Sequence, residues 1–256
     1  MPSRSYHMEV VSRLKGLDKI IIGEIERHPV FCIRLGKRGK PKVLISAGMH
    51  GNEPAAVYAL IEFIRKYIKD YDYRFYIYPC INPTGFESCT RLNHEGVDIN
   101  RNFKPFSRVQ EVSIIKRHLR KGPKAYALTI DMHEDDPLDG QRVNGFYLYE
   151  NSKERKLGRK IINNISRYFP VCRDKTIEGD INDNGVIYYP EACRNTELCK
   201  RTSFDAFLSK KYTNQSLVTE TPVLWLLERR IKAHLIALKT ALNELSEPFS
   251  EPSSKL

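Results

Sequence analysis

Short apolar runs of four to eight residues alternate along this chain with segments in which apolar residues recur every three or four positions. Runs of that length, bounded by glycine, proline, asparagine or charge, are typical of strands, and the spacing between them is typical of helices. The alternation therefore predicts an α/β fold with one mixed, twisted β-sheet of about eight strands and helices on both faces. The predicted strands are 19–26, 30–36, 42–47, 73–79, 125–132, 144–149, 184–189 and 216–220.

Helical spacing is clearest in residues 53–67, directly after the third predicted strand. Further helices are predicted at 107–121, 151–168, 197–210 and 222–246, the last with Pro222 in its first turn, where a missing N–H costs nothing. The first two strands are separated only by Arg27, His28 and Pro29, which predicts a hairpin at the sheet edge. No repeat or linker interrupts the pattern, so a single domain is predicted over 1–246, followed by a flexible tail at 247–256.

The charge of the chain is unevenly distributed. Lys and Arg number 42 against 31 Asp and Glu, for a formal net charge of +11. The excess lies mainly in residues 1–50 and 104–124, whereas 131–141 carries five acidic residues and no basic one. Because scattered charge does not make a nucleic-acid site, we expect a basic outer surface without specific nucleic-acid binding.

The remaining composition points to a protein made without export. The six cysteines contain no CxxC pair and are expected to be reduced. No segment has the roughly 18 consecutive apolar residues of a membrane span, and the start lacks the apolar region of a signal peptide. These features predict a cytoplasmic protein that does not bind membranes, and they leave its oligomeric state open.

Two predicted strands end in potential metal ligands. The segment KVLISAGMHGNEP places His50 and Glu53 where a buried strand leaves the sheet, and KAYALTIDMHED ends a second apolar strand at Met132 and exposes His133. Open α/β sheets hold their ligands beyond the carboxyl ends of their strands. Two histidines and one glutamate that leave a fourth position for water form the usual ligand set of a hydrolytic zinc site.

Two further segments carry polar side chains suited to substrate binding and proton transfer. TRLNHEGVDINRNF, residues 90–103, contains Asn100 next to Arg101, a pairing that can grip a carboxylate in two places. QSLVTETP, residues 215–222, ends an apolar strand at Glu220, where a carboxylate suits a general base.

Taken in order, HGNE, TRLNHEGVDINRNF, the strand-end His133 and the late Glu220 resemble the M14 zinc carboxypeptidases, most closely the short bacterial, murein-peptide amidase-like branch. The resemblance covers about residues 40–245 and implies a zinc carboxypeptidase-like domain with one Zn²⁺ ion. It implies that His50, Glu53 and His133 bind this ion, and that Asp98 orients the first histidine from outside the ligand set.

The same resemblance assigns roles in substrate binding and catalysis. It implies that Asn100 and Arg101 hold the terminal carboxylate of the substrate and that Arg91 polarises the carbonyl of the cleaved bond. It also implies that Glu220 takes a proton from the attacking water and passes it to the leaving amine.

The resemblance leaves two features open. Family members often carry a mobile tyrosine before the last strand, and Tyr188, Tyr189 and Tyr212 all qualify by position. The segment SFDAFL, 203–208, is expected near the side-chain pocket, but either Phe204 or Asp205 could shape it, and these two predict opposite substrates.

The function predicted from the sequence is zinc-dependent hydrolysis of a peptide bond next to a free carboxylate, with Glu220 as general base. An N-acyl amino acid deacylase of the related aspartoacylase and succinylglutamate desuccinylase type is the first alternative, because it shares HGNE, the Asn-Arg pair and the zinc histidine. NRNF and the position of Glu220 favour the peptidase. A catalytically silent binding protein on the same fold is the second alternative.

Overall fold

The computed structural model describes residues 3–135, 144–188 and 202–245. Its centre is an eight-stranded sheet with the order β1-β2-β4-β3-β5-β10-β6-β9. The strands are β1 (Lys19–Ile25), β2 (His28–Leu35), β3 (Lys42–Ala47), β4 (Arg74–Tyr78), β5 (Leu128–Asp135), β6 (Tyr147–Ser152), β9 (Val186–Tyr188) and β10 (Gln215–Pro222). The predicted single-domain α/β fold with about eight strands is thus confirmed.

The sheet is mixed, as predicted. Its middle strands β4, β3, β5 and β10 are parallel neighbours, and β6 and β9 are also parallel to each other. The pairs β1 with β2, β2 with β4, and β10 with β6 are antiparallel. The predicted hairpin of the first two strands is therefore correct, with β1 at one edge of the sheet. Because β3, β5 and β10 are parallel, their carboxyl ends meet at one place.

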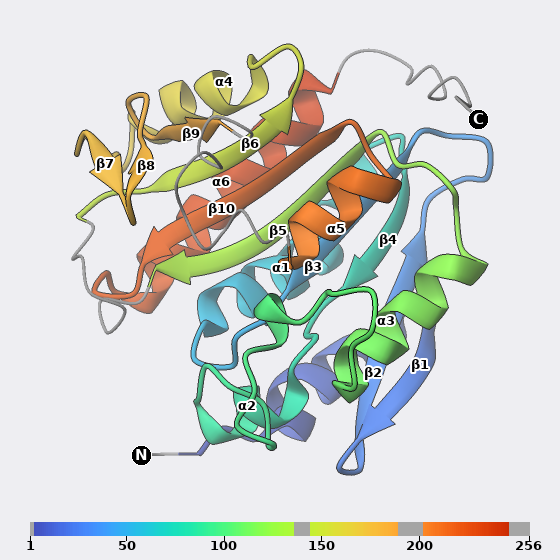
Figure 1. Ribbon diagram of the computed structural model, residues 1–256. Coiled ribbons are helices and arrows are strands. Elements are labelled where there is room, and N and C mark those ends of the chain that lie inside the picture. The colour runs from blue at the N-terminus through green and yellow to red at the C-terminus, as the bar shows by residue number, and fades with distance from the viewer. Residues whose placement is uncertain (1–2, 136–143, 189–201, 246–256) are drawn as a thin grey trace.

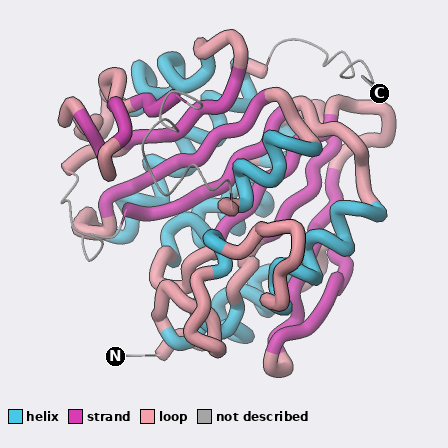
Figure 2. Tube along the Cα trace, viewed as in Figure 1, coloured by secondary structure: helices cyan, strands magenta, loops and turns pink. Residues whose placement is uncertain are grey.

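Helices cover both faces of the sheet (Figures 1 and 2). On one face lie α1 (Pro54–Lys66), α4 (Leu157–Ile165) and α6 (Leu227–Glu244), whose apolar sides pack on the larger core. On the other face lie α3 (Gln110–Lys121) and α5 (Phe204–Lys211), which bury a second core with β3 and β4. No helix among the described residues has a stretch long and apolar enough to cross a membrane.

Several small elements were not predicted. They are α2 (Pro83–Ser88), a π-helix (His7–Val11), three 3₁₀ turns (Ser12–Leu14, Ile68–Asp70 and Ile99–Arg101), and the two-stranded sheet of β7 (Thr176–Ile177) and β8 (Asp180–Ile181). Helix α2 depends on a local cap, because the Asn82 side chain accepts a hydrogen bond from the Gly85 amide at 2.9 Å. Elements this short have no repeating apolar pattern from which they could be predicted.

Two boundaries differ from the prediction in ways that matter for the site. Pro222 is the last residue of β10, and α6 begins five residues later at Leu227. Strand β5 continues past Met132 through the polar residues 133–135, so His133 lies within a strand and is 2% exposed. Both differences have one cause. Strand β10 pairs with β5 as far as Pro222 opposite Asp135, and this pairing keeps the polar end of β5 and the end of β10 in extended conformation.

Two predictions fall outside the described residues in whole or in part. The start of the helix predicted at 197–210 and the tail at 247–256 belong to the undescribed ranges. The described part of that helix is α5, which continues to Lys211.

Candidate metal centre

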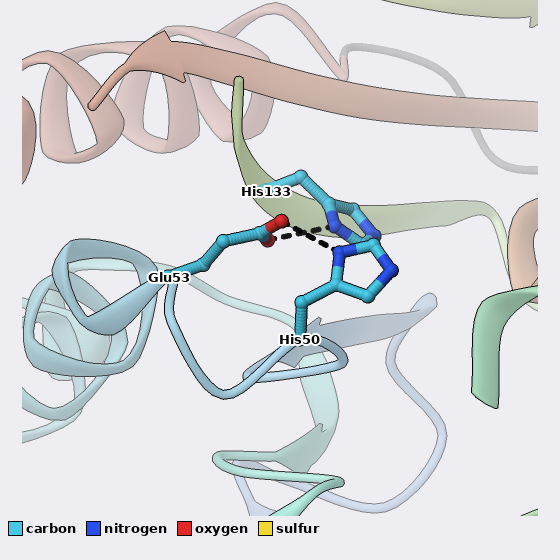
Figure 3. Close-up of side chains that lie close together, drawn as sticks. All are labelled: His50, Glu53 and His133. Carbon is cyan, nitrogen blue, oxygen red and sulfur yellow. Dashed lines mark hydrogen bonds and ion pairs between the residues drawn. The ribbon is translucent and has the colours of Figure 1, made fainter. Parts of the chain in front are cut away.

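The three predicted metal ligands, His50, Glu53 and His133, lie together at the carboxyl edge of the sheet (Figure 3). The Nδ1 atoms of His50 and His133 lie 2.6 Å and 2.9 Å from the two carboxylate oxygens of Glu53. Each residue offers one ligand atom, and these atoms all lie within 4.8 Å of one another. All three side chains are buried. A turn after β3 and the interior of β5 thus bring together residues that are 80 positions apart in sequence.

The outer nitrogen of each histidine faces a second carboxylate. His50 Nε2 lies 3.4 Å from an oxygen of Asp98, and His133 Nε2 lies 3.1 Å from an oxygen of Asp131. Asp131 is itself held by the Ser46 hydroxyl, which donates to its other oxygen at 2.6 Å. Such carboxylates set the tautomer of a metal-binding histidine, since they accept the proton of the nitrogen that does not face the metal. The contact of His133 with Asp131 is of this kind, and with Nε2 protonated the Nδ1 lone pair of His133 points towards Glu53.

The electrostatics of the cluster suit a divalent cation. Burial alone would raise the pKa of Glu53, but the two histidines in contact with it hold that pKa below its usual range. Burial opposes protonation of His133, yet Asp131 and Glu53 raise its pKa well above the usual value. Two histidine nitrogens and a carboxylate, each histidine backed by an acid, are the donor set that zinc prefers. The residues present therefore fit a zinc ion.

The turn that carries His50 and Glu53 has a tight backbone environment. At Gly51 a Cβ atom would lie 1.8 Å from the backbone carbon of Gly85, so only glycine fits. The guanidinium of Arg4 donates to the Gly51 carbonyl at 2.8 Å and so ties the N-terminal segment to this turn. Pro54 then begins α1, where its missing N–H leaves nothing unpaired.

Glu134, the neighbour of His133, connects three elements behind the His50, Glu53 and His133 cluster. Its carboxylate accepts a hydrogen bond from the Ala55 amide at 2.6 Å and pairs with Arg230 of α6. Burial, partly offset by Arg230, raises the pKa of Glu134 to about 7. Since Ala55 follows Glu53 by two residues, this carboxylate holds the start of α1 against β5. It was not singled out from the sequence, because Arg230 comes close only through the packing of α6.

Glu220 lies beside the triad. On β10 it is the register partner of His133 on one side and of Tyr147 on the other, and its side chain lines the same pocket as the three ligands. Burial raises its pKa well above the usual value, and the charge of His133 opposes this shift. The structure thus brings Glu220 to the metal cluster, as its position at a strand end predicted.

A buried histidine supports β10 beside Glu220. The two ring nitrogens of His234, on α6, each lie 3.2 Å from a hydroxyl, one of Thr219 and one of Thr221. These threonines flank Glu220, and side chains alternate along a strand, so the contact lies on the face away from the pocket. Burial lowers the pKa of His234 to about 3, so the ring is neutral at ordinary pH.

We expect His234 to make the fold sensitive to acid. Its pKa is about 3 in the folded state and about 6.5 in the unfolded chain, so its stabilising effect is complete above pH 6.5 and is lost progressively as the pH falls towards 3. The free energy of unfolding should fall by at most about 1.4 kcal/mol per pH unit through this one group. Urea unfolding of the wild type and of His234→Gln from pH 7 to pH 4 checks this, and parallel stability curves for the two proteins would contradict it.

The predicted substrate residues line the same pocket. Arg91, Asn100 and Arg101 all contribute to its wall. The Arg91 Nε donates to Asp98 at 3.2 Å, and the side-chain Oδ1 of Asn100 accepts a hydrogen bond from the Phe204 backbone amide at 2.9 Å. Asp98 therefore contacts both His50 and Arg91, and these positive groups outweigh burial and keep its pKa low. The structure brings together all eight site residues predicted from the sequence.

The structure places four of the five residues that the sequence left open. Phe204 is fully buried against Phe103, whereas Asp205 lines the pocket. Tyr188 stacks with Arg155, and Tyr212 packs in the second core, so neither lines the pocket; Tyr189 lies outside the described residues.

The pocket also holds residues that the sequence analysis missed: Glu134, Asp135, Tyr147, Tyr149, Glu178, Ser203 and Val218. For Asp131, behind His133, a signal existed. Residues two apart in a strand share a face, so a carboxylate two positions before a strand-borne histidine could have been expected to contact it.

A buried His-Glu-His set at the carboxyl edge of parallel strands, with arginines and a carboxylate in the same pocket, is typical of a zinc carboxypeptidase-like centre. Comparison with known proteins agrees with this description. Residues 15–133 match the family model described as zinc carboxypeptidase, peptidase M14. The chain is thus similar to the M14 zinc carboxypeptidases in this part of its sequence, and it shares its fold with metallopeptidase-like structures over nearly its whole length.

The structural relatives are metallopeptidase-like proteins. A "putative metallopeptidase" from Shewanella amazonensis matches with a TM-score of 0.77 and 25% identity, over 94% of this chain and 92% of that one. A metallo-carboxypeptidase from Burkholderia cenocepacia matches with a TM-score of 0.62 and 17% identity, over 93% of this chain and 67% of that one. Product-bound cell shape determinant protein Csd4 from Helicobacter pylori matches with a TM-score of 0.62 and 16% identity, over 86% of this chain and 56% of that one. No curated protein sequence matches significantly.

Proposed function

We propose that this protein is a zinc-dependent metallocarboxypeptidase that hydrolyses a peptide bond next to a free carboxylate. The observation that carries the proposal is the placement of Glu220 in register with His133, in one pocket with the metal ligands and with Arg91 and Arg101. That pocket holds a candidate base and a candidate set of metal ligands. It also holds two arginines, one for the terminal carboxylate of the substrate and one for the negative charge that develops on the peptide carbonyl during the reaction.

The ligand set supports a role for one zinc ion. When bound by His50, Glu53 and His133, zinc lowers the pKa of a water ligand towards about 7 and polarises a carbonyl group. The chain's own contribution begins outside the ligands. Asp131 accepts the Nε2 proton of His133 and so fixes that ring, and Asp98 places a negative charge 3.4 Å from His50 Nε2.

Each remaining pocket residue has a separate role in the proposed reaction. Arg101 and the Asn100 amide hold the substrate's terminal carboxylate, which places the last peptide bond against Glu220. Glu220 removes a proton from the attacking water and then delivers it to the nitrogen of the leaving amino acid. Arg91, oriented by its hydrogen bond to Asp98, stabilises the negative oxygen that forms from the peptide carbonyl.

A deacylase acting on N-acyl amino acids is the alternative, since it would use the same zinc ligands and the same carboxylate clamp. The Glu220 side chain, which the sequence places as in the peptidases, favours peptide hydrolysis. A silent binding protein is disfavoured because all the ligands, the base and both arginines are present in one pocket.

The proposal is tested by giving the zinc-loaded protein peptides with a free C-terminus, the same peptides with an amidated C-terminus, and N-acyl amino acids. We expect release of the last residue from the free peptides and a loss of about 10²-fold or more in kcat/KM on amidation, since a charged bidentate contact is removed. Hydrolysis of the N-acyl amino acids alone would instead establish the deacylase, and no turnover of any substrate would favour a binding protein.

A further inference from the structure

Helix α6 lies behind the candidate metal centre, on the opposite face of the sheet from the pocket. It packs against α1 and β10 (Figure 1). Two of its polar side chains, Arg230 and His234, are four residues apart and therefore project from the same side of the helix. The side-chain hydrogen bonds of both residues lead to strands that carry site residues.

The register of β5 and β10 explains how α6 reaches the site. Glu220 lies opposite His133, and the next pair along the two strands is Thr221 opposite Glu134. Because side chains alternate along a strand, the first pair faces the pocket and the second faces α6. The backbone that carries a candidate ligand and the candidate base is thus held from its other face by this helix.

Arg230 reaches the turn of the metal ligands through one carboxylate. Its guanidinium pairs with one oxygen of Glu134, and the other oxygen accepts a hydrogen bond from the Ala55 amide at 2.6 Å. Ala55 follows Glu53 by two residues, so the contacts run from α6 to a candidate metal ligand. The Glu134 side chain is fully buried and that of Arg230 is 13% exposed. Replacing a buried ion pair by apolar residues is often neutral or stabilising, so stability alone does not explain this pair.

His234 holds the strand of the candidate base. Its two ring nitrogens lie 3.2 Å from the hydroxyls of Thr219 and Thr221, which flank Glu220. The imidazole is a rigid ring, and it contacts β10 at two points on either side of the base. It therefore restricts both the twist and the displacement of the strand at Glu220.

The electrostatic neighbours of His234 show how close this side of α6 is to the centre. Besides burial, the groups that affect the pKa of His234 are Glu53, Arg230 and His133. Two of these three are candidate metal ligands. The helix face that carries Arg230 and His234 is therefore the immediate support of the ligand cluster.

We propose, building on the carboxypeptidase function above, that Arg230 and His234 are positioning residues for the reaction. Arg230 fixes Glu53 in the ligand turn, and His234 fixes Glu220 on β10. Because both side chains belong to one helix, α6 sets the distance between the metal ligands and the base. Neither residue touches the substrate or the metal.

The first test measures zinc affinity, which needs no turnover. Arg230→Met keeps a long side chain but removes the contact with Glu134. We expect the dissociation constant for zinc, from competition with a chelator, to rise about tenfold, at the lower end of the effects of groups that orient metal ligands. Arg230→Lys can still donate to Glu134 and should stay within about twofold of the wild type.

The second test measures turnover of the zinc-loaded protein with a peptide that has a free C-terminus. His234→Phe keeps a ring but loses both threonine contacts. We expect kcat to fall about tenfold, because a small displacement of the base from the reacting water is costly, while KM and zinc affinity stay within about twofold. His234→Gln can still hydrogen-bond to a threonine and should recover part of the loss.

Leu238→Ala is the matched control on the same helix. Leu238 is 1% exposed and packs in the larger core one turn beyond His234, so its truncation weakens α6 without removing a contact to the site. Zinc affinity and kcat should stay within about twofold while urea unfolding shows the variant to be folded. Losses as large as those of Arg230→Met and His234→Phe would mean that α6 acts through general stability, and the positioning role would be wrong.

A local measurement separates this inference from the proposed function. Amide hydrogen exchange over β10 should be faster in His234→Phe and unchanged in Leu238→Ala, whether or not any peptide is hydrolysed. Without hydrolysis by the wild type the carboxypeptidase function fails, and zinc affinity and hydrogen exchange still decide the role of α6. Wild-type zinc affinity in Arg230→Met, or wild-type kcat and exchange in His234→Phe, would overturn the positioning role and leave the hydrolysis proposal standing.

Discussion

Glu220→Gln is expected to lower kcat for peptide hydrolysis by about 10²–10⁴-fold, the usual contribution of a general base. Glutamine keeps the shape of the side chain but cannot accept the proton of the attacking water. Because Glu220 is not among the ligand atoms of the His50, Glu53 and His133 cluster, the zinc content should stay at the wild-type level. Single-turnover kinetics and metal analysis of the same sample measure both quantities.

Glu150→Gln is unsuitable as a control for this change, because Glu150 caps α4 through the Leu157 and Gly158 amides. Glu154→Gln is the better match, since its side chain is largely exposed and pairs only with Lys156 among the described residues. Full turnover by Glu220→Gln would show that another group takes the proton, and the mechanism proposed above would then be wrong.

His50→Ala is expected to abolish stable zinc binding. It removes one of the three ligands and leaves Glu53 with a single histidine contact in a buried site. The loss of affinity should exceed the 10–100-fold that removal of an outer carboxylate costs, so Asp131→Asn should fall between His50→Ala and the wild type. Competition with a chelator of known affinity gives the three values.

The control for this prediction is His7→Ala, which removes an exposed histidine from the N-terminal π-helix. It should bind zinc as the wild type does. Unchanged zinc content in His50→Ala would mean that the metal is held elsewhere. Circular dichroism and urea unfolding of the metal-free proteins establish whether any loss reflects unfolding instead of a missing ligand.

The structure confirms the predicted fold class because the signals behind it are local. Strands 42–47 and 73–79 are short segments of mainly apolar residues, and α1 repeats its apolar residues at helical spacing. Their burial therefore follows largely from the order of residues alone. The end of β10 could not be predicted in this way. Pro222 is compatible with a first helical turn, and only its pairing opposite Asp135 makes it the end of a strand.

The site shows the same division between local and long-range information. The sequence was sufficient to predict His50, Glu53, His133 and Glu220, because each lies at or near the end of an apolar run whose strand direction could be inferred. It did not predict the contact of Glu134 with Arg230, 96 positions away, or the entry of the β7–β8 hairpin into the pocket. Neither has a periodic signal, because both arise where separate elements pack together.

The amino-acid sequence by itself determined the α/β architecture, the candidate metal ligands, the candidate carboxylate-binding pair and the candidate base, because these depend on residue type and on position relative to strands. Only the tertiary structure decided that Phe204 is a core residue and Asp205 a pocket residue, since helix α5 presents one side to the core and another to the site. It alone also placed Glu178 at the pocket wall. The identity of a side chain is local, whereas the surface that it faces depends on every element that packs around it.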